Sequence, residues 1–150
     1  MFSGKPIDYQ NAELTNNGFW PDLNLADFQA QRAIPPDMDA NTVSGALLAA
    51  VMEVNADLDK VEAKHRAAGH ETAEAVPGPK IEGKNGVCAQ YTKAVFARAK
   101  ADLLGEFATI GRRETHPGQE SAETRDGLLA ESSVTIRHMK GLKRVSVRKV

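Results

Sequence analysis

The sequence lacks paired cysteines, long apolar runs and a large stock of aromatic residues. A single cysteine, Cys88, among 150 residues excludes an internal disulfide and agrees with a reducing compartment. No run of roughly eighteen apolar residues occurs, so we expect no membrane-spanning helix, and the first residues lack the basic-then-apolar order of a signal peptide. Five Phe, two Tyr and one Trp must share the core with Ala, Leu and Val. We therefore predict a soluble, intracellular protein of one domain with no membrane partner.

Recognisable catalytic motifs are also absent. The patterns GxxxxGK[ST], GxGxxG, GxSxG and HExxH do not occur. His65 and His70 have a poor spacing for two metal ligands on one helix face. Cys88 lies near the start of a predicted helix, where the helix dipole could lower its thiol pKa, but a small buried core residue is the simpler interpretation. The sequence predicts no enzyme, no cofactor and no metal site.

Charge is unevenly distributed, although the formal net charge is only −1. Residues 1–59 hold nine acidic and two basic residues, whereas residues 137–150 hold six basic residues and no acidic one. A basic end could neutralise nucleic-acid phosphates. It could also meet an acidic protein surface, and it has neither an aromatic residue for base stacking nor a helix-turn-helix in front of it. A small DNA-binding regulator therefore stands as an alternative to a protein-interaction module.

The segment 39–69 predicts one long central helix. Its apolar residues recur in steps of three and four, which places them on one stripe of a helix. Asp37 or Asp39 can cap the first turn, and Gly69 can take the left-handed conformation that ends helices. The stripe is expected to face the core through Val43, Leu47, Val54, Leu58 and Val61.

Three more helices complete a mainly α fold, a bundle of about four helices. They are predicted over residues 23–33, 87–110 and 121–140, with N-caps at Asn24, Asn85 and Ser121 respectively. The segments 69–86 and 112–120 contain the proline and glycine residues that separate these helices. The core positions expected on residues 87–110, opposite the long helix, are Tyr91, Val95, Leu103 and Phe107.

The N-terminal end lacks the periodicity of the helical middle. Residues 1–20 predict a flexible, extended arm, followed by a helical domain over residues 21–141. The arm leads into Phe19, Trp20 and Pro21, which are bulky or rigid residues. They can anchor the first helix, cover one end of the core or bind a neighbouring subunit.

The C-terminal end also departs from helical patterning. From Val145 onward, residues 142–150 alternate valine with polar side chains, which is typical of a β-strand. A single strand needs a partner from the same chain or from another molecule. This segment is the first indication of assembly.

Three blocks of the sequence, in order, resemble the head completion/stabilisation proteins of contractile-tailed temperate phages, the GPL family. The first is Gly18–Asn24 (GFWPDLN), an aromatic-aromatic-Pro-Asp entry into a helix. The second is Leu47–Leu58 (LLAAVMEVNADL), in which an apolar run leads into Asn-Ala-Asp-Leu. The third is Arg144–Val147 (RVSV), a basic residue before an alternating apolar tail. The segments 76–86 and 112–120 match nothing in that pattern.

The resemblance implies a structural virion protein without enzymatic activity. Proteins of this kind are similar to head–tail adaptors, which form a ring, here expected to be a dodecamer, beneath the portal protein. The ring would seal and stabilise the DNA-filled head and offer a docking platform to a tail terminator or another neck protein. Assembly would occur in the host cytoplasm, and packaged DNA would pass through the channel without sequence-specific contacts. The outer face of the long helix, with Glu53, Asp57 and Lys60, would then face neighbouring subunits or the channel.

The resemblance also suggests a role for the C-terminal strand. As a hypothesis, it adds to a strand of the portal or of a neighbouring subunit, with Val145 and Val147 as anchors and Arg144 and Arg148 as charged guides. The contact residues would be Leu142, Lys143, Arg144, Val145, Ser146, Val147, Arg148, Lys149 and Val150.

Overall fold

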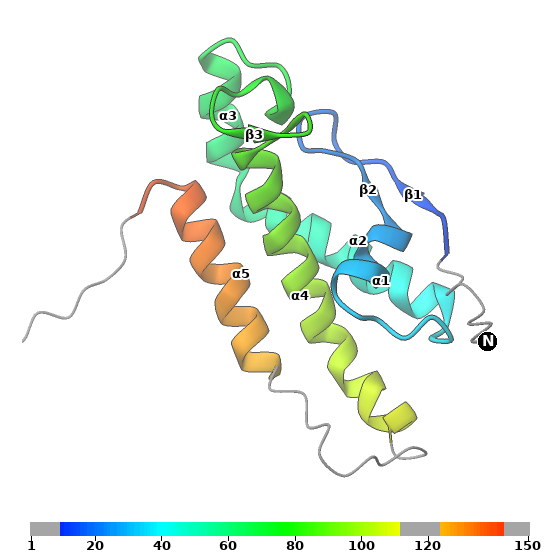
Figure 1. The fold of residues 1–150 in the computed structure, drawn as a ribbon. Coiled ribbons are helices and arrows are strands. Elements are labelled where there is room, and N and C mark those ends of the chain that lie inside the picture. The colour runs from blue at the N-terminus through cyan, green and yellow to red at the C-terminus, as the bar shows by residue number, and fades with distance from the viewer. Residues whose placement is uncertain (1–9, 112–123, 143–150) are drawn as a thin grey trace, which may run out of the picture.

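The computed structural model describes residues 10–111 and 124–142, with side chains described as far as Glu106 in the first of these ranges. The described part is mainly helical (Figure 1). Its helices are α1 (Leu25–Gln31), α2 (Ala40–Asp57), α3 (Asp59–Ala67), the short 3-10 helix η1 (Ala73–Ala75), α4 (Gly86–Gly111) and α5 (Arg125–Met139). Two antiparallel pairs of short strands accompany them, β1 (Glu13–Leu14) with β2 (Leu23–Asn24) and β3 (Lys80–Ile81) with β4 (Lys84–Asn85). None of the helices in these described ranges is both long and apolar enough to cross a membrane.

The central helix is α4, and not the segment 39–69 as predicted. In Figure 1, α5 runs alongside α4 on the left, and α2 crosses behind it. Small residues let α5 approach α4 closely, since Ala97 and Ala101 pack against Leu128. The hydroxyl of Ser132 also donates a hydrogen bond to the carbonyl oxygen of Ala94, at 2.9 Å. Helix α4 therefore supports α2 on one of its faces and α5 on another.

The predicted long helix is divided in two at Leu58. This residue has φ −103° and ψ 12°, outside the regular helical range, and α3 leaves the direction of α2 there (Figure 1). The bend lets α3 turn beside the aromatic loop before β2, where the ring of His65 stacks on that of Phe19 at a centroid distance of 6.1 Å. The apolar steps continue through the bend, so periodicity predicted one helix where the structure has two.

The ends of the helices follow the predicted capping chemistry in most cases. The side chains of Asn24 and Asp39 accept hydrogen bonds from the backbone N–H groups of Ala26 and Thr42. At the end of α3, Gly69 has φ +94° and its N–H donates to the carbonyl oxygen of Arg66. Helix α5 is capped by Thr124 rather than by Ser121, which lies outside the described residues.

The N-terminal segment is packed from Gln10 onward, which differs from the unpacked arm predicted over residues 1–20. Strand β1 pairs with β2, with Glu13 opposite Asn24 and Leu14 opposite Leu23. The backbone N–H of Gln10 donates to the side-chain oxygen of Gln29 in α1, at 3.0 Å. Residues 1–9 lie outside the described part of the chain.

One apolar cluster forms the core between α1, α2, α4 and the segment before β2. Several positions predicted for the core lie buried in it, namely Val43, Leu47, Val54, Leu58, Tyr91, Val95 and Leu103. Val61 is only partly buried and packs against the edge of the cluster. The side chain of Phe107 lies outside the described residues. The structure adds Phe28 and Phe96 to this core, with ring centroids 5.1 Å apart.

Candidate interaction surfaces

The aromatic pair before β2 is committed to the interior of its own chain. Phe19 and Trp20 are each only 2% exposed and meet edge to face with ring centroids 4.8 Å apart. Trp20 also lies parallel to the ring of Tyr91 in α4, with centroids 4.8 Å apart. The guanidinium of Arg66 lies 5.2 Å from the centre of the Phe19 ring. The structure therefore places the pair as an anchor within the subunit, where it has little surface left for a neighbour.

A ring of polar contacts locks this anchor to two helices. The side-chain amide of Asn16 donates to the hydroxyl of Tyr91 at 2.8 Å, and that hydroxyl donates to the side-chain oxygen of Asn55 in α2 at 2.6 Å. The amide of Asn55 donates back to the side-chain oxygen of Asn16 at 2.9 Å, which closes the ring. Burial raises the pKa of Tyr91 well above its ordinary value, so the phenol stays protonated and able to donate.

Asn16 and Asn17 also fix the turn that presents the aromatic pair. The side-chain oxygen of Asn17 accepts hydrogen bonds from the backbone N–H groups of Phe19 and Trp20, both at 3.0 Å. The amide of Asn17 donates to Glu62 in α3 at 2.6 Å, while the amide of Asn16 donates to the carbonyl oxygen of Pro21 at 2.9 Å. Sequence reasoning missed these asparagines, because such residues are equally typical of an unpacked loop.

Another asparagine, Asn85, organises the loop between α3 and α4. Asn85 is buried and caps α4, since its side-chain oxygen accepts from the N–H of Cys88 at 2.9 Å. Its amide donates to the carbonyl oxygens of Ala73 and Val76, at 2.7 and 3.0 Å. The sequence predicts the cap that Asn85 provides. It gives no signal for the second role of Asn85, which holds η1 against α4.

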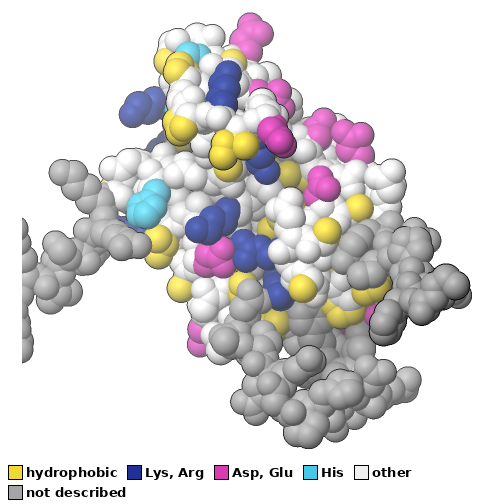
Figure 2. Space-filling model, viewed as in Figure 1, with side chains coloured by type: hydrophobic (Ala, Val, Ile, Leu, Met, Phe, Trp, Pro, Cys, Tyr) yellow, Lys and Arg dark blue, Asp and Glu magenta, His cyan; other side chains and the backbone are white. Residues whose placement is uncertain are grey.

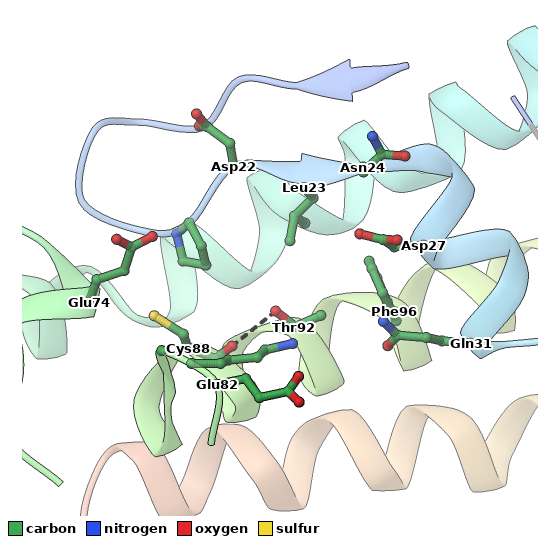
Figure 3. A pocket seen from close by; sticks show the side chains of 13 residues that line it. Asp22, Leu23, Asn24, Asp27, Gln31, Glu74, Glu82, Cys88, Thr92 and Phe96 are labelled. Atoms are coloured by element: carbon green, nitrogen blue, oxygen red, sulfur yellow. Dashed lines mark hydrogen bonds between the residues drawn. The ribbon is translucent and has the colours of Figure 1, made fainter. Parts of the chain in front are cut away.

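An acidic cleft of about 290 Å³ opens between the segment around β2, the β3–β4 hairpin and α4 (Figure 3). Four carboxylates from different elements line it, namely Asp22, Asp27, Glu74 and Glu82, and Lys84 is the one basic residue in this lining. Figure 2 shows acidic side chains gathered on the upper right of the viewed face. The cleft has a polar wall in which the hydroxyl of Thr92 is satisfied by the carbonyl oxygen of Cys88, at 2.9 Å.

Three residues have reactive or metal-ligating side chains in or near the helix ends, namely Cys88, His65 and His70. Cys88 is buried, and burial raises its thiol pKa, which opposes the lowering expected from a helix start. His65 and His70 lie near each other, with ring centroids 6.4 Å apart. Among the described residues no three His, Cys, Asp or Glu side chains are grouped as metal ligands would be.

Large apolar side chains remain on the surface at separate places. On α2, Leu48 is 52% and Met52 is 74% exposed. On and after α5, Val134 is 43% and Leu142 is 47% exposed, and Ile81 in the β3–β4 hairpin is 79% exposed. Exposed apolar groups on the outer faces of two helices are candidates for protein contacts.

The charged residues expected to face outward from the long helix are partly used within the subunit. Arg98 in α4 pairs with Asp57 at 3.2 Å and with Glu53 at 3.5 Å. Both carboxylates therefore lean toward α4 instead of pointing directly away from the core, which corrects the predicted orientation. They remain substantially exposed, and Lys60 is exposed as well. A negative edge thus borders the outer face of α2.

A family model described as phage head completion protein (GPL) matches residues 14–150. A curated relative, a probable head completion/stabilization protein of Haemophilus phage HP1 (strain HP1c1), is 42% identical over 147 residues, which cover 98% of each chain. This chain belongs to the GPL family of phage head completion proteins. No solved structure matches it.

Membership of the GPL family confirms the resemblance identified from the sequence and supports a structural role in the phage head. The aromatic block Gly18–Asn24 and the block Leu47–Leu58, which carried that resemblance, form the anchor and the second half of α2 in this head completion protein. The third block, Arg144–Val147, lies outside the described residues, as do the other predicted contact residues after Leu142. Leu142 itself follows α5 and is not part of a strand.

Proposed function

We propose that this protein forms a ring beneath the portal, completes and stabilises the DNA-filled phage head, and provides the platform on which the tail docks. The observation that carries the proposal is the 42% identity, over nearly the full length, to a protein named for head completion and stabilization. The partners would be the portal protein, further copies of this chain in a dodecamer, and a tail terminator or other neck protein. The protein would act in the virion neck after assembly in the host cytoplasm.

The charge distribution supports a channel that packaged DNA can pass without being held. Four described acidic side chains, Asp22, Asp27, Glu74 and Glu82, line one cleft with a single lysine, Lys84, and this excess of negative charge repels phosphate groups. DNA would therefore cross the ring without sequence-specific contacts. A DNA-binding regulator would instead bind duplex DNA tightly, and this binding would weaken steeply with salt. A gel-shift titration against salt tests this alternative.

The segment Leu142–Val150 is proposed to dock on the portal or on a neighbouring subunit by strand addition. Support comes from its alternating sequence and from the place where the chain leaves α5. Gly141, with φ +77°, donates to the carbonyl oxygen of His138, and Leu142 donates to that of Arg137, which ends the helix at an exposed corner. A chain truncated after Gly141 should lose portal binding, and unchanged binding would contradict the docking role.

The function itself is tested by removing the protein from the phage. Without it, we expect heads that package DNA but lose it, together with free tails, when lysates are viewed by electron microscopy. Supplying the intact chain from a plasmid should restore infectious particles. Normal DNA-filled, tailed particles without the protein would overturn the proposal.

A further inference from the structure

Strand β1 has one edge that no strand of the described residues covers, since it pairs with β2 alone. The backbone N–H of Leu25 donates to the carbonyl oxygen of Ala12 at 2.8 Å. Inter-strand hydrogen bonds involve every second residue of an antiparallel pair, so the backbone N–H and C=O of Glu13 point away from β2. In Figure 1, β1 lies on the outer side of β2. This outer edge therefore offers one donor and one acceptor to a further strand.

A groove of about 200 Å³ lies between β1 and α2. Its lining is mainly apolar and comprises residues 12–15 together with Leu25, Ser44, Leu47 and Leu48. On β1, Leu14 packs against the core and Glu13 is exposed, so one face of the strand is turned inward and the other toward solvent. Side chains of a strand alternate between two faces. A strand added to β1 would therefore send every second side chain toward the groove and the others toward solvent beside Glu13.

The charge around this edge is negative. Glu13 is the one charged side chain in the lining of the groove. From Gln10 to Gln31 the chain carries three carboxylates and no basic side chain, and α2 carries no charge from Ala40 to Met52. A strand that fits here has apolar side chains on one face and basic side chains near its ends or on the other face.

One segment of the chain has this pattern, and it lies outside the described residues. In residues 143–150, Val145 and Val147 alternate with polar residues, and the segment has four basic side chains and no acidic one. Residues 1–9, which precede β1, fit the edge less well because they contain Pro6, which has no backbone N–H to donate. The sequence therefore favours residues 143–150 as the strand that the edge accepts.

The groove and the start of this segment lie at opposite ends of α2. Leu142 shares a cavity with Asp57, where α2 meets α3, whereas Ser44 of the groove lies thirteen residues earlier, about 20 Å along the helix. A fully extended chain places Val145 at most about 11 Å from Leu142. In Figure 1, α5 ends on the left and β1 lies on the right. The valines thus fill the groove of another molecule, and a contact of this kind repeats from copy to copy and closes into a ring when the rotation permits.

We propose that residues 143–150 of one copy add as a strand to the outer edge of β1 in the next copy of this chain. Val145 and Val147 enter the groove beside Leu47 and Leu48, and basic side chains of the segment lie near Glu13. The inference rests on the proposed ring and strand addition, and it names the strand that accepts the segment. Backbone hydrogen bonds hold the added strand, and the valines fix its register.

Thiol crosslinking in the virion tests the contact. Phages would carry Leu48→Cys with Val147→Cys, or either change alone, and purified virions would be oxidised and analysed on non-reducing denaturing gels. The double variant should give a ladder of disulfide-linked chains, whereas each single variant should run as a monomer. Ile81→Cys with Val147→Cys is the matched control, because Ile81 is more exposed than Leu48 but lies on the β3–β4 hairpin, and it should give no ladder. The native Cys88 is buried and common to all variants.

The outcomes separate this contact from the proposed function. If the chain is present in virions but the double variant gives no ladder, the contact is wrong and the ring can still be right. A fast-migrating monomer with an internal disulfide would show that the segment fills the groove of its own molecule, which also overturns the contact. If Val147→Cys alone becomes linked to another virion protein, the segment docks elsewhere. If the unmodified chain is absent from virions, both proposals fail.

A second set of variants tests the backbone pairing within the same crosslinking experiment. Glu13→Pro removes the outward N–H and leaves the hydrogen bonds to β2, so it should lower the yield of the Leu48→Cys, Val147→Cys ladder by about threefold or more. Glu13→Gln keeps the N–H and should leave the yield within about twofold, since an exposed charge contributes little. Val145→Asp places a carboxylate in the groove and should also remove most of the ladder. The purified chains should keep their unfolding temperature, and equal yields for all three variants would contradict the contact.

Discussion

The aromatic anchor and the outer face of α2 both carry large apolar side chains, yet they serve different ends. Phe19 and Trp20 are enclosed by Tyr91 and a closed ring of asparagine hydrogen bonds, so their surface is used within one chain. Leu48 and Met52 lie in α2, the same helix as Asn55 of that ring, but they remain open to solvent. The difference indicates that the anchor stabilises the subunit, whereas Leu48 and Met52 contribute little to its stability. Substitutions should therefore divide into those that unfold the monomer and those that leave it intact.

The largest expected effect is at the anchor. Trp20→Ala removes a buried indole that stacks on Tyr91 and should lower the free energy of unfolding by about 3 to 5 kcal/mol. Chemical denaturation of the purified chain measures this loss. Met52→Ala is the control from the other region, and its effect should stay within about 0.5 kcal/mol because the side chain is exposed. Similar losses for both variants would remove the distinction between the two regions.

The hydrogen-bond ring provides the next test. Tyr91→Phe keeps the aromatic packing but leaves Asn16 and Asn55 without the hydroxyl that joins them. The free energy of unfolding should fall by about 1 to 3 kcal/mol, since buried polar groups lose their partner. An unchanged free energy of unfolding would mean that the hydrogen-bond ring positions the anchor without stabilising the fold.

A smaller effect is expected where α1 meets α5. Arg32 donates to both carboxylate oxygens of Glu131, at 2.8 and 3.2 Å, and this hydrogen bonding lowers the pKa of Glu131 below 4.5. The carboxylate therefore favours the folded state above that pH, and the contribution is lost as the pH falls further. Glu131→Gln should lower stability by about 0.5 to 1 kcal/mol at neutral pH, since partial exposure screens the pair. The difference between variant and original chain should shrink in acid.

The smallest effect concerns His65, which stacks on Phe19. Burial, followed by the charges of His70 and Lys64, lowers the pKa of His65 below 6.5. The unfolded chain then binds the proton more readily, so acidification through this range should lower the unfolding temperature slightly. His65→Gln should flatten that dependence as the pH falls through and below the ordinary pKa of histidine. If the unfolding temperatures of the variant and the original chain fall equally steeply with acidification, the pH dependence comes from other titratable groups.

The helices could be predicted from the sequence where a buried stripe coincides with clear end signals. Helix α4 spans Gly86–Gly111 and was predicted over residues 87–110, because its apolar steps and the Asn85 cap agree. The bend at Leu58 could not be predicted, since the apolar steps pass through it without a proline or glycine. A helix boundary that is set by packing against a distant segment has no signal in the local sequence.

The contact surfaces were less accessible to sequence reasoning than the core. The ring formed by Asn16, Asn55 and Tyr91 joins residues far apart in sequence, and an isolated asparagine carries no sign of its partner. Leu48 and Met52 lie within an apolar run that reads as core, and only the orientation of α2 on α4 leaves them outside. The exposure of these two side chains depends on tertiary packing, so it could be identified only from the structure.

The most direct measurement is a localised cryo-electron microscopy reconstruction of the portal vertex in the phage that encodes this chain. We predict a ring of these subunits beneath the portal. A reconstruction in which the neck lacks this chain, because the chain lies elsewhere in the virion or is absent from it, would contradict the proposed role.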